Sequence, residues 1–215
     1  FRNVTGVQTC ALPISIELVS ARKVDRIAWI AYEEGRRNVF TAAAPAFAPM
    51  RLTSFMKDDG TDLTTLRIAD DGSAVAFVRG SAPNSAGWVA NPGGDPNGAE
   101  RAIWAVRTAT PGTERRLAEG TNPEVSPDGR YVLYVKDGQI YRAPVSAPAA
   151  PTKVDKGEAP FINAWGRNSG PKWSPDGTRI AFSSNRTDHS FIGMYDERTK
   201  LVSYVAPNVD RDTSP

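Results

Sequence analysis

A phrase built on Asp-Gly recurs along the chain and constrains the fold more than any other feature of the sequence. It reads LRIADDGSAVAFV at 66–78, PEVSPDGRYVLYV at 123–135 and PKWSPDGTRIAFS at 171–183. Each copy has a short apolar piece, an Asp-Gly pair, and then a run in which apolar residues alternate with small or polar ones. A degraded copy, VDRIAWI at 24–30, precedes them. The chain is therefore organised as repeats of about fifty residues.

The repeated phrase predicts a β-hairpin. In Ser-Pro-Asp-Gly, proline suits the second position of the turn, aspartate can hydrogen-bond the backbone, and glycine supplies a positive φ. After each turn, β-branched and aromatic residues alternate with the period of a strand and not of a helix.

Two further strands are expected in every repeat. The third strands are expected at 38–43, 102–107, 139–144 and 191–196, and the fourth at 50–55, 114–119, 151–156 and 201–206. Short strands in fours, with no helical segment between repeats, are typical of β-propeller blades, whereas a β-sandwich would not repeat one four-strand pattern. We predict an all-β fold: a partial β-propeller of about four blades, each of four antiparallel strands, at approximately 16–60, 61–120, 121–168 and 169–212.

The two ends of the sequence differ from the repeats between them. VTGVQTCALPI at 4–14 lacks strand alternation and holds the single cysteine, Cys10. Its back-translation resembles the adaptor ligated to DNA in short-read sequencing, so residues 1–15 are interpreted as an unstructured artefact preceding a propeller at 16–215, with a genuine N-terminal segment as the alternative. The closing DTSP matches the openings of earlier repeats. We therefore expect a fragment of a longer propeller, marginally stable alone and prone to association.

Composition and charge argue against several classes of function. Lys and Arg number 26 against 24 Asp and Glu, a net charge of +2, so no basic surface for nucleic acid is expected. No apolar run approaches the ~18 residues of a membrane span. One histidine, and no cysteine outside residues 1–15, exclude the usual metal-ligand sets. We expect neither a metal nor another cofactor.

Longer phrases point to a family. SPDGTRIAFSSNRTDHSFIGMYD at 174–196, VDRDTSP at 209–215 and RNVFTAAAPAFAPMRLTS at 37–54 resemble the N-terminal propeller of the prolyl oligopeptidase family, particularly its dipeptidyl-peptidase-like and acylaminoacyl-peptidase-like members. The resemblance covers residues 15–215. It implies a propeller of seven or eight blades that covers a C-terminal α/β-hydrolase domain and admits short peptides to it. It also implies a periplasmic or secreted serine peptidase.

No catalytic residue of that family maps onto this chain. The hydrolase's G-x-S-x-G motif is absent, and His189 is the only histidine. The expected role is therefore noncatalytic gating, with the hydrolase domain and peptide substrates as partners, and whether the parent protein is an enzyme stays open. A TolB-like propeller that binds protein partners without enzymatic activity is the alternative. A repeat module of an adhesive or structural surface protein is a third.

Loops joining the second and third strands should share one face of the propeller, where binding usually resides. On that face we single out Arg186, Asp188 and His189 as substrate-binding candidates. Asp188-His189-Ser190 also invites a catalytic triad. Neighbouring side chains of an extended segment point to opposite faces, however, so a loop before a strand is the better interpretation.

Three further candidates lie in other repeats. Dipeptidyl-peptidase relatives hold the substrate's α-amino group with paired propeller glutamates, which suggests Glu33 and Glu34; yet the pair runs into Gly35 and two arginines, as an ordinary hairpin turn would. The 80–100 insertion, rich in Gly, Pro and Asn, contains Trp88. We expect Trp88 to pack on the hydrolase domain or border the substrate entrance, or else to fold onto its own blade.

Overall fold

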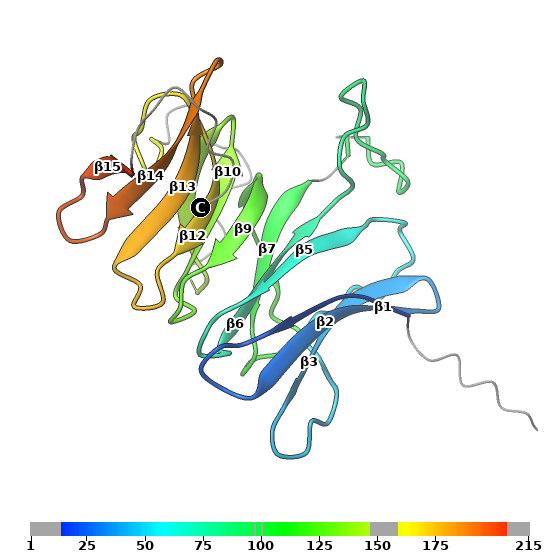
Figure 1. The fold of residues 1–215 in the computed structure, drawn as a ribbon. Coiled ribbons are helices and arrows are strands. Elements are labelled where there is room, and N and C mark those ends of the chain that lie inside the picture. Colours follow the sequence, from blue (N-terminus) through cyan, green and yellow to red (C-terminus); the bar gives the residue numbers. More distant parts are fainter. Residues whose placement is uncertain (1–13, 97, 100, 147–158, 206–215) are drawn as a thin grey trace, which may run out of the picture.

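The computed structural model describes residues 14–96, 98–99, 101–146 and 159–205, and these form strands, turns and bends. Figure 1 shows the strands as sheets set side by side, like the blades of a fan. Blade 1 contains β1 (Ile14–Ser20), β2 (Arg26–Glu33), β3 (Arg36–Ala43) and β4 (Met50–Arg51). Blade 2 contains β5 (Leu63–Ile68), β6 (Ala74–Arg79), β7 (Ala102–Arg107) and β8 (Arg115–Glu119). Blade 3 contains β9 (Thr121–Val125), β10 (Tyr131–Lys136) and β11 (Gln139–Pro144). Blade 4 contains β12 (Arg167–Trp173), β13 (Arg179–Asn185), β14 (Ser190–Asp196) and β15 (Val202–Val205).

The predicted all-β partial propeller is confirmed. Strand order follows chain order in each sheet, and neighbouring strands are antiparallel. The first strands of the blades (β1, β5, β9 and β12, called the inner strands) lie next to one another. Each blade is therefore a meander that starts on the inside of the fan and runs outward.

Two expectations fall at the margins of the described residues. The fourth strand expected at 151–156 lies outside them; at that edge of blade 3, Ile162 forms an isolated bridge with Ile140 of β11. The supposed artefact at 4–14 also lies outside them, except that Ile14 opens β1 and pairs with Tyr32. The division of the chain at residue 15 stays a prediction.

The Asp-Gly hairpins have the predicted geometry. The Gly129 N–H donates to the Ser126 carbonyl at 2.9 Å, and the Gly177 N–H donates to the Ser174 carbonyl at 2.9 Å. Gly129 has φ +64°, and a Cβ there would come within 2.0 Å of the Ser73 hydroxyl in blade 2. Glycine is thus required at that position both by the backbone conformation and by the neighbouring blade.

A feature not predicted from the sequence recurs in the inner strands. Thr65, Asn122 and Gly170 occupy one repeat position and have φ of +55°, +51° and +58°. The pairing of each inner strand with its neighbour shifts register beside these residues. This is a β-bulge, which bends the strand and leaves one residue in the left-handed region.

The core lies between the blades, in three clusters. In β6, Phe77 packs in the cluster shared with blade 1, and Ala76 in the cluster shared with blade 3. In β10, Tyr134 likewise packs toward blade 2, and Leu133 toward blade 4. Successive residues of a strand point to opposite sheet faces. In blades 2 and 3, the second strand therefore turns an aromatic residue toward the preceding blade and a smaller residue toward the following blade.

Candidate functional site

The antiparallel meanders give the propeller two different faces. The Asp-Gly turns lie on one, called the turn face. The loops joining second to third strands lie on the opposite one, called the loop face, together with the connections from one blade to the next. Figure 1 shows this separation: the 80–101 loop and the β13–β14 loop stand at the top, away from the turns at the bottom.

Arg186 lies at the loop face within a cluster of aromatic rings. Its guanidinium carbon is 4.4 Å from the Trp165 ring centroid and 5.2 Å from that of Tyr204. The Arg186 Nη2 donates to the Tyr204 hydroxyl at 2.6 Å. Gly166 makes the stack possible, because a Cβ there would come within 2.9 Å of the Arg186 Cδ. Within the described part of the chain, Arg186 has no carboxylate partner.

Asp188 and His189 lie beside this cluster. The His189 Nδ1 is 2.6 Å from the Asp188 Oδ1, and the imidazole centroid is 4.7 Å from that of Phe191. Phe191 also lies 5.7 Å from the Arg186 guanidinium carbon. The Asp188 backbone N–H and the His189 side chain hold the pKa of the Asp188 carboxyl below its usual range. The structure thus brings Arg186, Asp188 and His189 together, around rings that the sequence did not single out.

Glu33 and Glu34 lie in a different blade and form part of a tight turn. Glu34 and Gly35 have φ of +51° and +81°, the signature of a type I′ hairpin between β2 and β3. The Glu34 carboxylate forms an ion pair with Arg36, whose Nε also donates to the Glu33 carbonyl. The structure does not bring this pair together with Arg186.

Trp88 stands out from the long loop of blade 2. Its side chain is 76% exposed, so it does not fold onto its own blade. The Asn84 side chain closes the loop beneath it, accepting from the Ala86 N–H at 3.0 Å and the Trp88 N–H at 2.9 Å. Trp165 shares the loop face and is 77% exposed.

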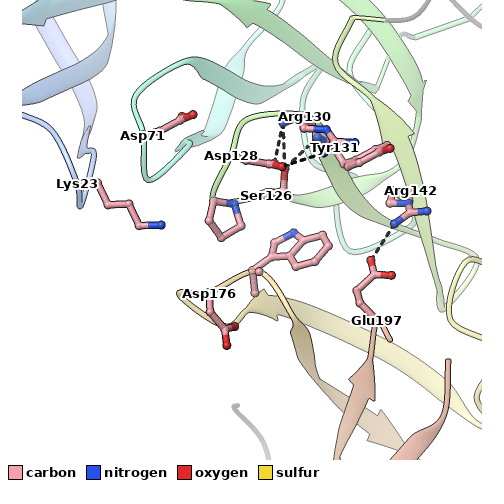
Figure 2. Close-up of a pocket in the computed structure, with 12 residues that line it drawn as sticks. Lys23, Asp71, Ser126, Asp128, Arg130, Tyr131, Arg142, Asp176 and Glu197 are labelled. Atoms are coloured by element: carbon pink, nitrogen blue, oxygen red, sulfur yellow. Dashed lines mark hydrogen bonds and ion pairs between the residues drawn. The ribbon is translucent and has the colours of Figure 1, made fainter. Parts of the chain in front are cut away.

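A cavity of about 450 Å³ opens at the turn face. Figure 2 shows its labelled wall residues, which come from the first turns of all four blades, from β10 and β11, and from the β14–β15 turn: Lys23, Asp71, Ser126, Asp128, Arg130, Tyr131, Arg142, Asp176 and Glu197. The sequence predicts these turns only as hairpins within single blades. Their convergence depends on the packing of blades and has no signal within one repeat.

Arg142 and Glu197 fix one wall of this cavity. The Arg142 Nη1 lies 2.8 Å from the Glu197 Oε1, and the guanidinium carbon is 3.8 Å from the Phe161 ring centroid and 4.5 Å from that of Tyr131. The other Glu197 oxygen lies 2.6 Å from the Lys200 Nζ, and this hydrogen bond raises the pKa of the Lys200 ammonium. Both charges of the ion pair are thus already compensated.

The aspartates of the hairpins are also engaged internally. The Ser174 hydroxyl donates to the Asp176 Oδ1 at 2.6 Å, and with hydrogen bonds from Thr178 it lowers the Asp176 pKa to about 2. Burial alone would raise the pKa of Asp128, but hydrogen bonds from Ser126 and the Arg130 N–H outweigh it and lower the value. Each carboxylate accepts hydrogen bonds from residues of its own turn and so stabilises that turn.

Charged residues also line the inner strands. Arg67, Glu124 and Lys172 occupy one repeat position in β5, β9 and β12 and border a cavity of about 240 Å³. The Glu124 Oε2 lies 2.8 Å from the Lys172 Nζ and 3.6 Å from the Arg67 Nε. Arg67 Nη1 is in turn 3.8 Å from the Glu17 Oε1. These charges alternate across four blades, so the axis of the fan is lined by compensated charge.

Three further observations concern only the residues that the structure describes. They contain no group of three or more His, Cys, Asp or Glu side chains placed to hold a metal ion. Trp173 is partly buried: it packs on the cluster between blades 3 and 4 and lines both cavities. No helix among these residues is long and apolar enough to cross a membrane.

Neither protein-family models nor curated protein sequences match this chain. Solved structures do. TolB from Acinetobacter baumannii matches 89% of this chain with 44% of its own, at 18% identity and TM-score 0.53. A TolB-type protein from Agrobacterium tumefaciens matches 91% with 63% of its own, at 19% identity and TM-score 0.50. A prolyl endopeptidase matches 92% with 30% of its own, at 12% identity and TM-score 0.63.

The chain therefore spans less than two thirds of the length of each of these proteins. At such identities the likeness shows the fold alone. The propeller is shared by peptidase domains and by TolB.

Proposed function

We propose that this propeller is the noncatalytic part of a serine peptidase, gating the access of short peptides to an α/β-hydrolase domain of the same protein. The observation that carries the proposal is the exposure of Trp88 and Trp165 at the loop face, 76% and 77%. Leaving large aromatic side chains in water is unfavourable, and Trp is enriched in protein interfaces. A hydrolase domain seated on the loop face would cover both indoles.

The other predicted site residues differ in how well they are placed to contact a peptide or the hydrolase domain. Arg186 has no carboxylate partner in the described part of the chain, and Trp165, which stacks on it, is exposed, so Arg186 is the best placed to meet a carboxylate of a peptide or of the hydrolase. His189 and Asp188 would border the same passage. Glu33 and Glu34 are poorer candidates for holding an amino group, since Arg36 already neutralises Glu34.

The compensated charges along the inner strands suit a gate. Glu124 is paired with both Lys172 and Arg67, so the axis offers no net charge that would trap a peptide of one sign. The TolB-like alternative also fits the exposed tryptophans, which would then meet a separate protein. Both versions agree with a periplasmic or secreted location, which we propose on the likeness of fold.

The proposal is tested on the reading frame that contains this sequence in its source DNA. We expect it to encode a G-x-S-x-G hydrolase domain, and the full-length protein to be labelled at that serine by a fluorophosphonate. The wild-type protein should cleave a tetrapeptide but not an unfolded protein.

Replacing Trp88 by Ser should loosen the docked domains and raise cleavage of the unfolded protein relative to the tetrapeptide. Replacing Leu201, an exposed residue of the β14–β15 turn, by Ser is the matched control and should leave the ratio unchanged. A frame that encodes blades without a hydrolase would reject the peptidase and leave the TolB-like alternative.

A further inference from the structure

Blade 2 holds an arginine among aromatic rings at the loop face, and a carboxylate completes its surroundings. The Arg79 guanidinium carbon is 4.9 Å from the Phe55 ring centroid and 5.9 Å from that of Trp104. The Asp59 carboxylate forms an ion pair with this guanidinium. Asp59 belongs to residues 56–62, the part of the blade 1–2 connection that separates Phe55 from β5.

Blade 4 repeats this arrangement without the carboxylate. Trp165, which stacks on the arginine there, corresponds to Phe55. Each ring lies three positions after a fully buried residue, Ile162 or Leu52, whose N–H donates to a carbonyl of the third strand of the preceding blade. Only Gly166 separates Trp165 from β12. The segment that carries the carboxylate in blade 2 therefore has no counterpart in blade 4.

The Arg186 guanidinium keeps donors that nothing in the described part of the chain accepts. Its Nη2 donates to the Tyr204 hydroxyl at 2.6 Å, but its Nε is buried without a hydrogen-bond partner. The nearest carboxylate in the sequence, Asp188, lies 2.6 Å from the His189 Nδ1 instead. A guanidinium carries five donors in a planar fork that matches a carboxylate. Arg186 thus lacks the kind of partner that Arg79 has.

The arginine of blade 4 lies on the side of that blade that faces blade 3. Tyr204 pairs with Gly193, and Gly193 pairs with Phe182, which packs in the cluster between these two blades. Arg167, at the start of β12, lies against Gly138 of blade 3 and has no ion pair among the described residues. Two positive charges without a carboxylate partner therefore lie at one end of the gap between blades 3 and 4, where they attract an anion.

We propose that Arg186 and Trp165 form a binding site for a carboxylate of a short peptide, either its C-terminal carboxylate or an acidic side chain. The Arg186 fork binds the carboxylate, and the exposed indole of Trp165 covers the adjoining part of the peptide. The choice of a peptide rests on the proposed function, whereas the carboxylate follows from the comparison with Arg79 and Asp59.

The test follows the indole N–H signal of Trp165 by nuclear magnetic resonance in the isotope-labelled 215-residue chain, with the signal assigned by its loss in Trp165→Phe. The probes are acetyl-Ala-Ala-Ala, which has a C-terminal carboxylate, the amide of acetyl-Ala-Asp-Ala, which has a side-chain carboxylate, and the amide of acetyl-Ala-Ala-Ala, which has neither. At least one carboxylate probe should shift the signal to saturation, and the uncharged amide should not. The probe that binds identifies the source of the carboxylate.

Substitutions separate the site from a general effect of charge. Arg186→Gln should weaken binding about tenfold or more, because the charge-assisted hydrogen bonds are lost. Arg198→Gln is the matched control: it removes the same charge from an exposed position of the β14–β15 turn, at the turn face of the same blade, and should bind like the wild type. Arg186→Lys keeps the charge without the planar fork, so its affinity should fall between the two. Unchanged far-ultraviolet circular dichroism checks that each variant folds, and Arg186→Lys serves alone if Arg186→Gln does not.

No shift with either carboxylate probe, an equal shift with the uncharged amide, or wild-type affinity in the Arg186 variants would overturn the proposal. This outcome is distinguishable from failure of the proposed function, because the binding measurement needs no hydrolase domain. A reading frame without a hydrolase would reject the peptidase and leave the carboxylate site standing. Serine labelling of the full-length protein without carboxylate binding would reject the site alone.

Discussion

Thr65 is strained where its counterparts in the next two blades are not. It has φ +55° at the bulge of β5, and the equivalent residues are Asn122 and Gly170. The left-handed region costs an ordinary L-residue about 1–2 kcal/mol, and asparagine tolerates it better than a β-branched residue does. No hydrogen bond of the Thr65 side chain offsets this cost within the described residues.

Replacing Thr65 by Asn should therefore stabilise the chain by about 1 kcal/mol, which corresponds to a rise in Tm of about 3 °C for a chain of this size. Thr65→Gly should gain less, since glycine loses more conformational freedom on folding. Urea unfolding followed by tryptophan fluorescence measures the change as a higher midpoint at constant slope.

The neighbouring Thr64 provides the control. It is exposed, pairs in register with Val78 and is not in the left-handed region, so Thr64→Asn should give no gain and a slight loss of strand propensity. The reverse change, Asn122→Thr, should destabilise by a similar amount. If Thr65→Asn is no more stable than Thr64→Asn, the strain argument is wrong.

Two other predictions concern packing and acid stability. Gly193→Ala should lower the free energy of unfolding by about 1–3 kcal/mol, because the added Cβ would lie 2.4 Å from the buried Phe182 ring; thermal melting checks this, and an unchanged Tm would mean that the ring moves freely. Asp128 and Asp176 have pKa values lowered on folding, to about 2 for Asp176, so their stabilising effect is present above about pH 4 and is lost as pH falls toward 2. The double variant Asp128→Asn, Asp176→Asn should lose less free energy of unfolding between about pH 4 and pH 2 than the wild type, as measured by urea unfolding at each pH. An unchanged pH dependence would contradict the stabilising role of these two carboxylates.

The repeat made the fold predictable because its signals are local. An Asp-Gly turn followed by alternation, as in 128–135, specifies a hairpin without reference to the rest of the chain. The inner-strand bulges gave no such signal, since Thr65, Asn122 and Gly170 share a backbone conformation but not a residue type. Only the alignment of three folded blades shows that one position is strained.

Likewise, only part of the candidate site could be predicted from the sequence. Arg186, Asp188 and His189 are close in sequence, so their proximity around Phe191 could be anticipated. The run of Glu34 into Gly35 predicts a hairpin turn, and both residues have the positive φ of such a turn. The stack of Trp165 on Arg186 could not be anticipated, because Trp165 lies in the connection before β12 and Arg186 lies in the loop after β13.

By itself the sequence determined the strands, their turns and their grouping into blades, because a strand's alternation and a turn's φ are set by neighbouring residues. The tertiary structure alone decided which charges meet along the inner strands and where the turn-face cavity opens. Those features arise where blades touch. Contacts between residues about fifty positions apart, such as Glu124 and Lys172, depend on how sheets pack and leave no pattern within a single repeat.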